Sequence, residues 1–228
     1  MSARYAIYYA PRRDSALWRR ASAWLGRDAY DGAPLERPAF PTLDGLDLDA
    51  LTSDPRGYGF HATLKAPFEL AQGETEADLL GFAAAFAEAR TPFAADIAPA
   101  LLGAFHAFRI AAPCPEMAAL HEACVRDFDR FRAPLSEHDI ARRRRAKLNA
   151  DQDRKMLTWG YPYIFDEFRF HMTLTGAIRD EAVSARIGAA LAEHFAAETG
   201  PHLFDGVAIF KQADRAAPFD ILARLDFG

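Results

Sequence analysis

The chain has 228 residues, of which 50% are hydrophobic, and a formal net charge of −5. This length and apolar content can fill the core of one large domain or of two closely packed lobes, and the negative charge argues against general adhesion to nucleic acid. No apolar run approaches the roughly 20 residues of a membrane span and no signal-peptide pattern opens the chain, so we expect a cytoplasmic protein without a membrane partner. Cys114 and Cys124 are too few for a disulfide framework or a metal-ligand cluster, and we expect reduced thiols.

The first half of the chain is predicted to alternate strands and helices. Asp14 or Ser15 is placed to cap a helix that Gly26 would close, and Thr75 with Asp78 forms a capping-box pattern. The expected elements are a strand over residues 4–10, a helix ending before residue 26, a surface loop rich in Pro, Gly and Asp over residues 29–55, a strand at residues 60–64, a helix over residues 75–90 and two strands around residue 103. The long loop is a candidate flap over a functional site.

The second half repeats this order around a polar insertion. The expected elements are a helix from about residue 115 to 131, a polar helical insertion over residues 136–159, a strand at residues 170–174, a helix over residues 180–198 and strands over residues 203–211 and 219–227. Because the order repeats and no flexible linker separates the halves, we expect one bilobal domain over residues 1–228, with lobes at approximately 1–112 and 113–228.

One short pattern occurs twice, in the two strands that open this repeated order. The copies are Phe60-His61-Ala62-Thr63-Leu64 and Phe170-His171-Met172-Thr173-Leu174, and their histidines are 171 − 61 = 110 residues apart. Alternation along a strand places the His and Thr of each copy on one face and the apolar residues on the other. Packing explains why a duplicated strand keeps its apolar face, but it gives no reason to keep His and Thr on the opposite face.

The residue types on this face suit a reaction at phosphorus. Histidine has an ordinary pKa of about 6.5, so one histidine can take a proton while a second gives one up. Threonine hydroxyls can donate hydrogen bonds to phosphate oxygens without adding charge. The same alternation sets further candidate anion contacts beside the two pairs, namely Lys65, Arg169 and Thr175. The pattern therefore predicts an anion site with paired acid and base.

The paired His-x-Thr-Leu phrases resemble the two-histidine (2H) phosphoesterase superfamily. Three segments, residues 4–11, 58–68 and 159–176, are similar to an uncharacterised bacterial branch associated with phosphonate-utilisation genes. The resemblance implies an α+β fold of two pseudo-symmetric lobes, each a mainly antiparallel sheet with helices outside, flanking a central cleft. It also implies catalytic roles for His61, Thr63, His171 and Thr173. Tyr58 and Lys211 are further candidate substrate contacts, through proximity and family-like placement.

Two other interpretations compete with this one, a metal site and substrate recruitment by a basic run. A metal site remains an alternative because Asp166 and Glu167 precede the second histidine, although threonine is a poor ligand. The basic run at residues 142–147 is most simply a solvated surface, and less favourably a recruiter of a phosphorylated or nucleic-acid substrate. The chain lacks the P-loop pattern of nucleotide-binding kinases and the serine elbow of hydrolases.

The predicted function is a metal-independent phosphodiesterase that acts on a small cyclic phosphate or related phosphodiester, with no cofactor. The resemblance suggests a setting in phosphonate metabolism and a sugar or nucleotide cyclic phosphate as substrate. RNA-end processing or ligation at a 2′-linked phosphate is one alternative, and a phosphate-binding module without turnover is another. Nucleic acid is the less favoured partner, and no protein partner is indicated.

Overall fold

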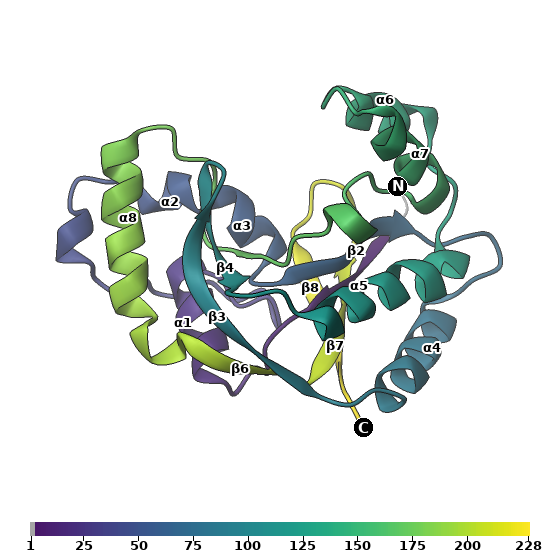
Figure 1. The fold of residues 1–228 in the computed structure, drawn as a ribbon, viewed down its shortest axis with the longest axis horizontal. Coiled ribbons are helices and arrows are strands. Elements are labelled where there is room, and N and C mark those ends of the chain that lie inside the picture. The colour runs from purple at the N-terminus through teal and green to yellow at the C-terminus, as the bar shows by residue number, and fades with distance from the viewer. Residues whose placement is uncertain (1–2) are drawn as a thin grey trace.

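Residues 3–228 are described by a computed structural model in which the strands form one curled antiparallel sheet with helices outside (Figure 1). The strand order is β6-β3-β4-β5-β2-β1-β7-β8, and every neighbouring pair is antiparallel. The strands are β1 (Arg4–Tyr9), β2 (Ala62–Glu69), β3 (Phe93–Leu102), β4 (Phe105–Ile110), β5 (Met172–Thr173), β6 (Gly200–Phe204), β7 (Gly206–Gln212) and β8 (Phe219–Asp226). The predicted α+β class with an antiparallel sheet is confirmed.

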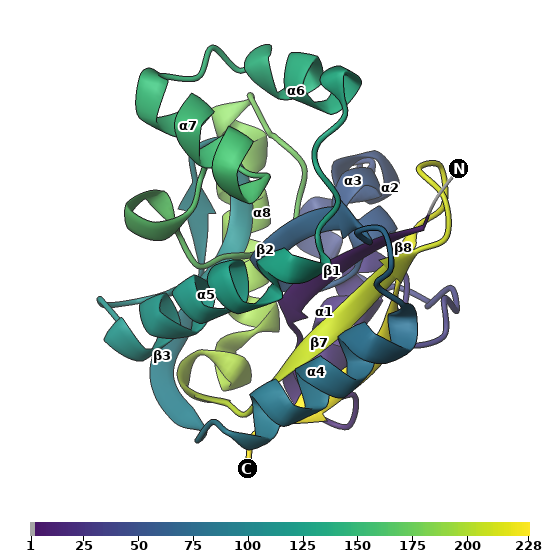
Figure 2. The same cartoon turned by 90° about the vertical axis from the view of Figure 1, so that its right-hand side faces the viewer.

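The helices lie along the outside of this sheet. They are α1 (Ala16–Leu25), α2 (Leu48–Leu51), α3 (Ser53–Tyr58), α4 (Glu76–Glu88), α5 (Pro115–Asp127), α6 (Glu137–Arg144), α7 (Ala150–Trp159) and α8 (Glu181–His194). Helix α8 packs on β3, α5 on β2, and α4 on β7 and β8. Helices α6 and α7 stand apart from the sheet (Figure 2). Within residues 3–228, no helix combines the length and apolar character needed to cross a membrane.

Local sequence signals account for the ends of several helices. The Ser15 hydroxyl accepts a hydrogen bond from the Trp18 N–H, and Gly26 closes α1 with a φ of 82°. Thr75 and Asp78 form the predicted capping box of α4. The polar insertion is helical, as predicted, and consists of α6 and α7. The loop expected over residues 29–55 contains more helix than expected, because α2 and the start of α3 lie within it.

Strands from distant parts of the chain alternate across the sheet. One half of the sheet is β6-β3-β4-β5 and the other is β2-β1-β7-β8, joined through the pairing of β5 with β2. Both halves therefore take strands from either side of residue 112. Apolar side chains from both halves of the sheet and from the helices outside form a contiguous core that includes Trp18, Tyr9, Phe108 and Phe210.

The single strand predicted over residues 203–211 is wrong, because this segment is divided between two regions of the sheet. Strand β6 pairs with β3 at one edge, whereas β7 lies between β1 and β8 near the other edge. Only Asp205 separates the two strands, so the sheet must curl until these regions meet. A Cβ at Gly206 would come within 2.5 Å of the Leu225 carbonyl oxygen, which explains why glycine follows the junction.

Candidate active site

The two His-x-Thr phrases meet where the two halves of the sheet join. Ala62 of β2 lies directly opposite Met172 of β5 in an antiparallel pair. The antiparallel register then sets His61 opposite Thr173 and Thr63 opposite His171, all on the face away from Ala62 and Met172. A local two-fold axis through this central pair therefore relates the two phrases.

All four of these side chains line one cavity of about 240 Å³. Its lining residues are Tyr8, Tyr58, His61, Thr63, Pro67, His171, Thr173 and Phe219. The face alternation predicted that the His and Thr of each copy share a face, and the structure brings the two pairs together at this cavity. Strand β5 is only two residues long, so His171 precedes the regular strand instead of lying within it.

Both histidines are held by the carbonyl group two residues before them. The Nδ1 atom of His61 lies 3.0 Å from the Gly59 oxygen, and that of His171 lies 2.7 Å from the Arg169 oxygen. Because a carbonyl oxygen only accepts hydrogen bonds, each Nδ1 carries the hydrogen and each neutral ring presents Nε2 as an acceptor. In His61 this Nε2 lies 3.3 Å from the Thr63 hydroxyl.

Burial favours the neutral form of both rings. The pKa of His61 is lowered to about 3, mainly by desolvation and also by the nearby His171, while the hydrogen bond to the Gly59 carbonyl opposes the change. Desolvation also lowers the pKa of His171, assisted by the charge of Arg109 and opposed by the Arg169 carbonyl. A negatively charged group in the cavity would favour the protonated form of either ring.

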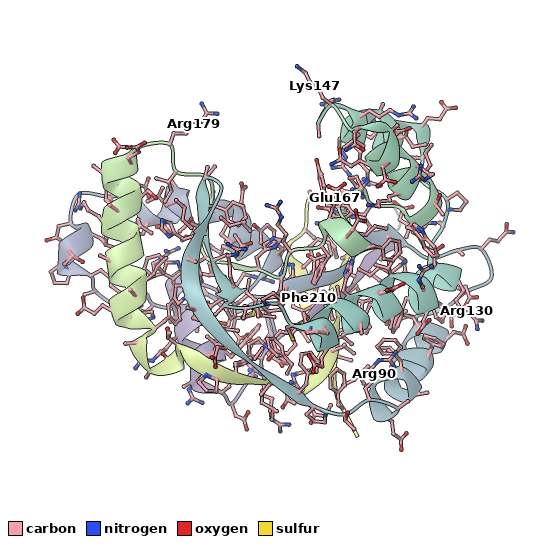
Figure 3. All side chains as sticks on the ribbon, in the orientation of Figure 1. Arg90, Arg130, Lys147, Glu167, Arg179 and Phe210 are labelled. Atoms are coloured by element: carbon pink, nitrogen blue, oxygen red, sulfur yellow. The ribbon has the colours of Figure 1, made fainter. Side chains whose placement is uncertain are left out.

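Aromatic side chains fix the plane of the His61 ring. Tyr8 stacks on it with ring centroids 3.7 Å apart and an interplanar angle of 10°, and Tyr58 meets it edge-on at 5.3 Å. Phe210, labelled near the centre of Figure 3, packs against the same ring at 5.5 Å. Tyr8 belongs to this site because its position in β1 is opposite Thr63 in β2. Sequence reasoning missed its role, since nothing local to residue 8 reveals that pairing.

Arg109 is a second residue that sequence reasoning missed. Ala107 of β4 lies opposite Thr173, so the register sets Arg109 opposite His171. Its Nε atom is buried without a hydrogen-bond partner among the described residues. The sequence signal that could have indicated Arg109 is its position as the single charged residue in a largely apolar strand segment, residues 105–110, Phe-His-Ala-Phe-Arg-Ile.

Three of the predicted substrate contacts are engaged elsewhere in the structure. Lys65 is buried and donates to the Val125 carbonyl at 2.7 Å and to Asp129 at 2.9 Å. The Thr175 hydroxyl accepts from the His106 N–H at 3.0 Å, and Lys211 pairs with Glu76 at 2.6 Å. The structure thus does not bring these three side chains to the cavity.

The other two predicted contacts do lie at the site. Tyr58 lines the cavity and interacts with Thr173. Arg169 is exposed and lines a second, larger cavity of about 540 Å³ that shares Thr63 and His171 with the first. Aromatic rings dominate the walls of this larger cavity, namely Phe105, His121, Tyr161, Tyr163 and Phe168. It offers an apolar space for the organic part of a ligand whose charged group lies between the histidines.

Acidic residues near the second histidine are occupied by other partners. Asp166 forms an ion pair with Lys155, and Glu167 accepts a hydrogen bond from Gln152 at 2.8 Å. Over the described range 3–228, no group of three or more His, Cys, Asp or Glu side chains is arranged to hold a metal ion. Cys114 and Cys124 are both free thiols.

Comparison with known proteins places this chain in a family. Residues 63–220 match the family described as "Protein of unknown function (DUF1045)". The chain is 41% identical over 229 aligned positions to "Ribose 1,5-bisphosphate phosphokinase PhnN" from Janthinobacterium sp. (strain Marseille), which covers 98% of this chain and 51% of the relative. It is 34% identical over 216 positions to the protein of the same name from Laribacter hongkongensis (strain HLHK9), covering 95% of this chain and 50% of the relative. The chain thus spans about half the length of these curated relatives.

Proposed function

The chain belongs to the DUF1045 family, and from its site we propose that it is a phosphodiesterase of the two-histidine type. Its substrate is a small cyclic phosphate or a related phosphodiester. The observation that carries this proposal is the pairing of Ala62 with Met172, which brings two His-Thr pairs around one cavity. The proposal covers the reaction, the 2H relationship and the catalytic roles of the four residues.

In the proposed reaction the two histidines act at one phosphorus atom, one as the base and the other as the acid. Nε2 of one histidine takes a proton from an attacking water, whose oxygen forms a bond to phosphorus. The ester P–O bond breaks, and the second histidine gives its proton to the leaving oxygen. Thr63 and Thr173 donate hydrogen bonds to the non-bridging oxygens, whose charge they stabilise. Because burial lowers the pKa of both rings, the negative charge of the bound substrate would favour protonation of the histidine that acts as the acid.

The names of the relatives bear on the substrate more than on the reaction. They describe a kinase of ribose 1,5-bisphosphate, but this chain spans about half of each relative. Its sequence contains no Gly-x-x-x-x-Gly-Lys-Ser/Thr loop for a nucleotide triphosphate. We therefore do not include kinase activity in the function proposed for this chain. The sugar phosphate in the relatives' names makes a phosphorylated sugar the first substrate to test. The resemblance to a phosphonate-associated branch favours the same choice.

The test is phosphorus NMR of chelator-treated protein with a panel of sugar and nucleotide cyclic phosphates. We expect native protein to open at least one of them, and His61→Ala and His171→Ala each to slow turnover by roughly 10²- to 10⁴-fold. His138→Ala is the matched control, since His138 is exposed on the polar insertion. The rate should follow a bell-shaped pH profile, because one ring must be neutral and the other protonated.

Three outcomes would contradict the proposal in different ways. Turnover that survives in both histidine variants would remove the paired proton transfer. Tight phosphate binding without turnover, unchanged in both variants, would favour the binding module instead. Activity confined to RNA ends, with no reaction of monomeric cyclic phosphates, would favour the RNA-processing alternative.

A further inference from the structure

A third cavity, of about 90 Å³ and beside the His-Thr site, is rich in arginine. Five arginines and two carboxylates are among its lining residues, which gives it an excess of positive charge in a chain whose net charge is −5. These charged residues are Arg4, Arg132, Arg142, Arg143 and Arg215, with Glu69 and Asp139. We call this cavity the arginine pocket.

The carboxylates of the arginine pocket neutralise only some of its arginines. Asp139 accepts from Arg215 at 2.8 and 2.9 Å and from Arg142 at 3.3 Å. Glu69 also pairs with Arg215, at 3.1 Å. Arg132 is bound by Asp129, which lies outside the pocket. None of these ion pairs involves Arg4 or Arg143.

Arg4 and Arg143 have no carboxylate partner among residues 3–228. Arg4 donates to the side-chain oxygen of Gln212, a neutral acceptor. The Nε atom of Arg143 is buried without a hydrogen-bond partner, and its guanidinium group lies 5.2 Å from the Tyr161 ring centroid. Burial lowers the pKa of both arginines, and so does the charge of neighbouring arginines, which shows that their repulsion is not fully relieved.

The arginine pocket adjoins both cavities of the proposed active site. Pro67 lines the arginine pocket and the cavity between the histidines. The Arg4 guanidinium lies 5.6 Å from the ring centroid of Phe219, another lining residue of the histidine cavity. Tyr161, beneath Arg143, lines the larger aromatic cavity. The arginine pocket therefore lies next to the proposed active site.

We propose that Arg4 and Arg143 form a second phosphate subsite, so that the preferred substrate carries a phosphate monoester in addition to the phosphodiester that is cleaved. This inference rests on the proposed function and narrows its substrate class. Guanidinium groups bind phosphate through paired, charge-assisted hydrogen bonds, and an unpartnered buried Nε–H is satisfied by such a ligand.

The shape of the pocket favours a small molecule over a nucleic-acid strand. A strand requires a track of basic groups along several phosphates, whereas these arginines converge on one small cavity. Of the basic run at residues 142–147, only Arg142 and Arg143 line it. Arg144 pairs with Asp153 at 2.7 Å, and Lys147 projects away from the molecule in Figure 3.

The experiment compares cytidine 2′,3′-cyclic phosphate with and without a 5′-phosphate. For native protein we expect the 5′-phosphate to raise kcat/KM by roughly tenfold to a hundredfold. In an Arg4→Gln/Arg143→Gln variant the ratio of the two kcat/KM values should fall close to one. Arg145→Gln, at an exposed position of the same basic run, should keep the native ratio.

Equal kcat/KM values for the two substrates with native protein would overturn the second subsite. A ratio that is unchanged in the double variant would overturn its assignment to Arg4 and Arg143. If a further rise follows when nucleotides are added beyond the 5′-phosphate, the pocket belongs to an RNA track and the small-molecule form is wrong.

A binding measurement separates failure of the subsite from failure of the proposed reaction. Calorimetric titration of the same two nucleotides into a His61→Ala/His171→Ala variant requires no turnover. Tighter binding of the 5′-phosphorylated nucleotide, lost when Arg4 and Arg143 are also replaced, would support the subsite even if native protein hydrolyses neither compound. Equal binding of both nucleotides would count against the subsite alone.

Discussion

At the scale of single residues, the two histidines share one local device. Each donates from Nδ1 to the carbonyl of the residue two positions earlier, and each therefore presents Nε2 to the cavity. This contact is local in sequence, so duplication of the phrase carries it to both copies. Tyr8, by contrast, stacks on His61 alone. The two rings are thus alike in tautomer and different in surroundings, which suits unequal acid and base roles.

We expect Lys65 to stabilise the fold without contacting the substrate. Its buried ammonium group is held by Asp129 and the Val125 carbonyl, so we expect Lys65→Met to lower the free energy of unfolding by about 2–4 kcal/mol. Turnover per folded molecule should stay near the native value. Urea denaturation and activity measured on the same preparations check this.

Lys147→Met is the control, since Lys147 is exposed and should change stability by less than about 0.5 kcal/mol. A Lys65→Met protein with native stability but greatly reduced kcat would show that this lysine contacts the substrate after all.

The sequence predicted which face His61 and Thr63 occupy, because side-chain alternation is a local property of a strand. The sequence could not predict which distant segments pack against that face at later positions of the strand. Lys65 has the same parity as His61 and Thr63, yet Asp129 from a distant segment engages it. The partner of Thr175, the backbone N–H of His106, comes from 69 residues away in the chain.

At the scale of elements, the turn between α3 and β2 sets the first histidine. Gly59 has a φ of 72° and a ψ of 174°, a conformation that is essentially restricted to glycine. Its carbonyl accepts from His61, and a Cβ added to it would lie 2.6 Å from the Cβ of Ala29. The turn therefore links the position of Ala29 in the preceding loop to the orientation of the His61 ring.

Gly59→Ala should both destabilise the protein and impair catalysis. We expect a loss of about 2–4 kcal/mol in unfolding free energy, from backbone strain together with the contact to Ala29. Displacement of the Gly59 carbonyl should also reduce kcat. Chemical denaturation and steady-state kinetics measure the two effects.

Gly73→Ala provides a matched control for the backbone contribution. Gly73 also has a positive φ, of 90°, but an added Cβ there meets nothing within 4 Å. This variant should lose only about 1–2 kcal/mol and keep native kcat. Equal effects of the two substitutions would mean that the contact with Ala29 is unimportant.

Helix ends were predictable because their signals are adjacent in sequence, as at Ser15 and the Thr75-Asp78 box. The junction at Asp205 was not, because β6 and β7 share one apolar pattern and differ only in their distant partners. The Asp-Gly pair at residues 205–206 was the one local signal of a break.

At the scale of the whole molecule, buried histidines make the stability depend on pH. Burial lowers the pKa of His61 to about 3 and that of His121 to about 4. In the unfolded chain both regain a pKa near 6.5, so between pH 6.5 and about 4 the unfolded state binds more protons than the folded state. Stability is therefore complete above pH 6.5 and falls as the pH drops through this range.

From pH 7.5 to pH 5 we expect each of these histidines to cost about 2 kcal/mol of unfolding free energy. Urea denaturation at the two pH values measures the total change, to which His202 also contributes because burial lowers its pKa to about 4. His121→Gln should reduce the difference, since its carbonyl oxygen can still accept the Phe165 N–H without titrating. Identical stability at pH 7.5 and pH 5 would show that the rings are not held neutral.

The position of β1 inside the sheet has a consequence for folding. Strand β1 lies between β2 and β7, and Arg4 is paired with Gln212. One edge of β1 therefore stays unpaired until β7 docks, and Arg4 and Gln212 are 208 residues apart in the sequence. Such remote pairings make folding slow, since a long segment must be ordered before they form. The strand that carries Tyr8 to His61 is thus completed only after this long-range pairing has formed.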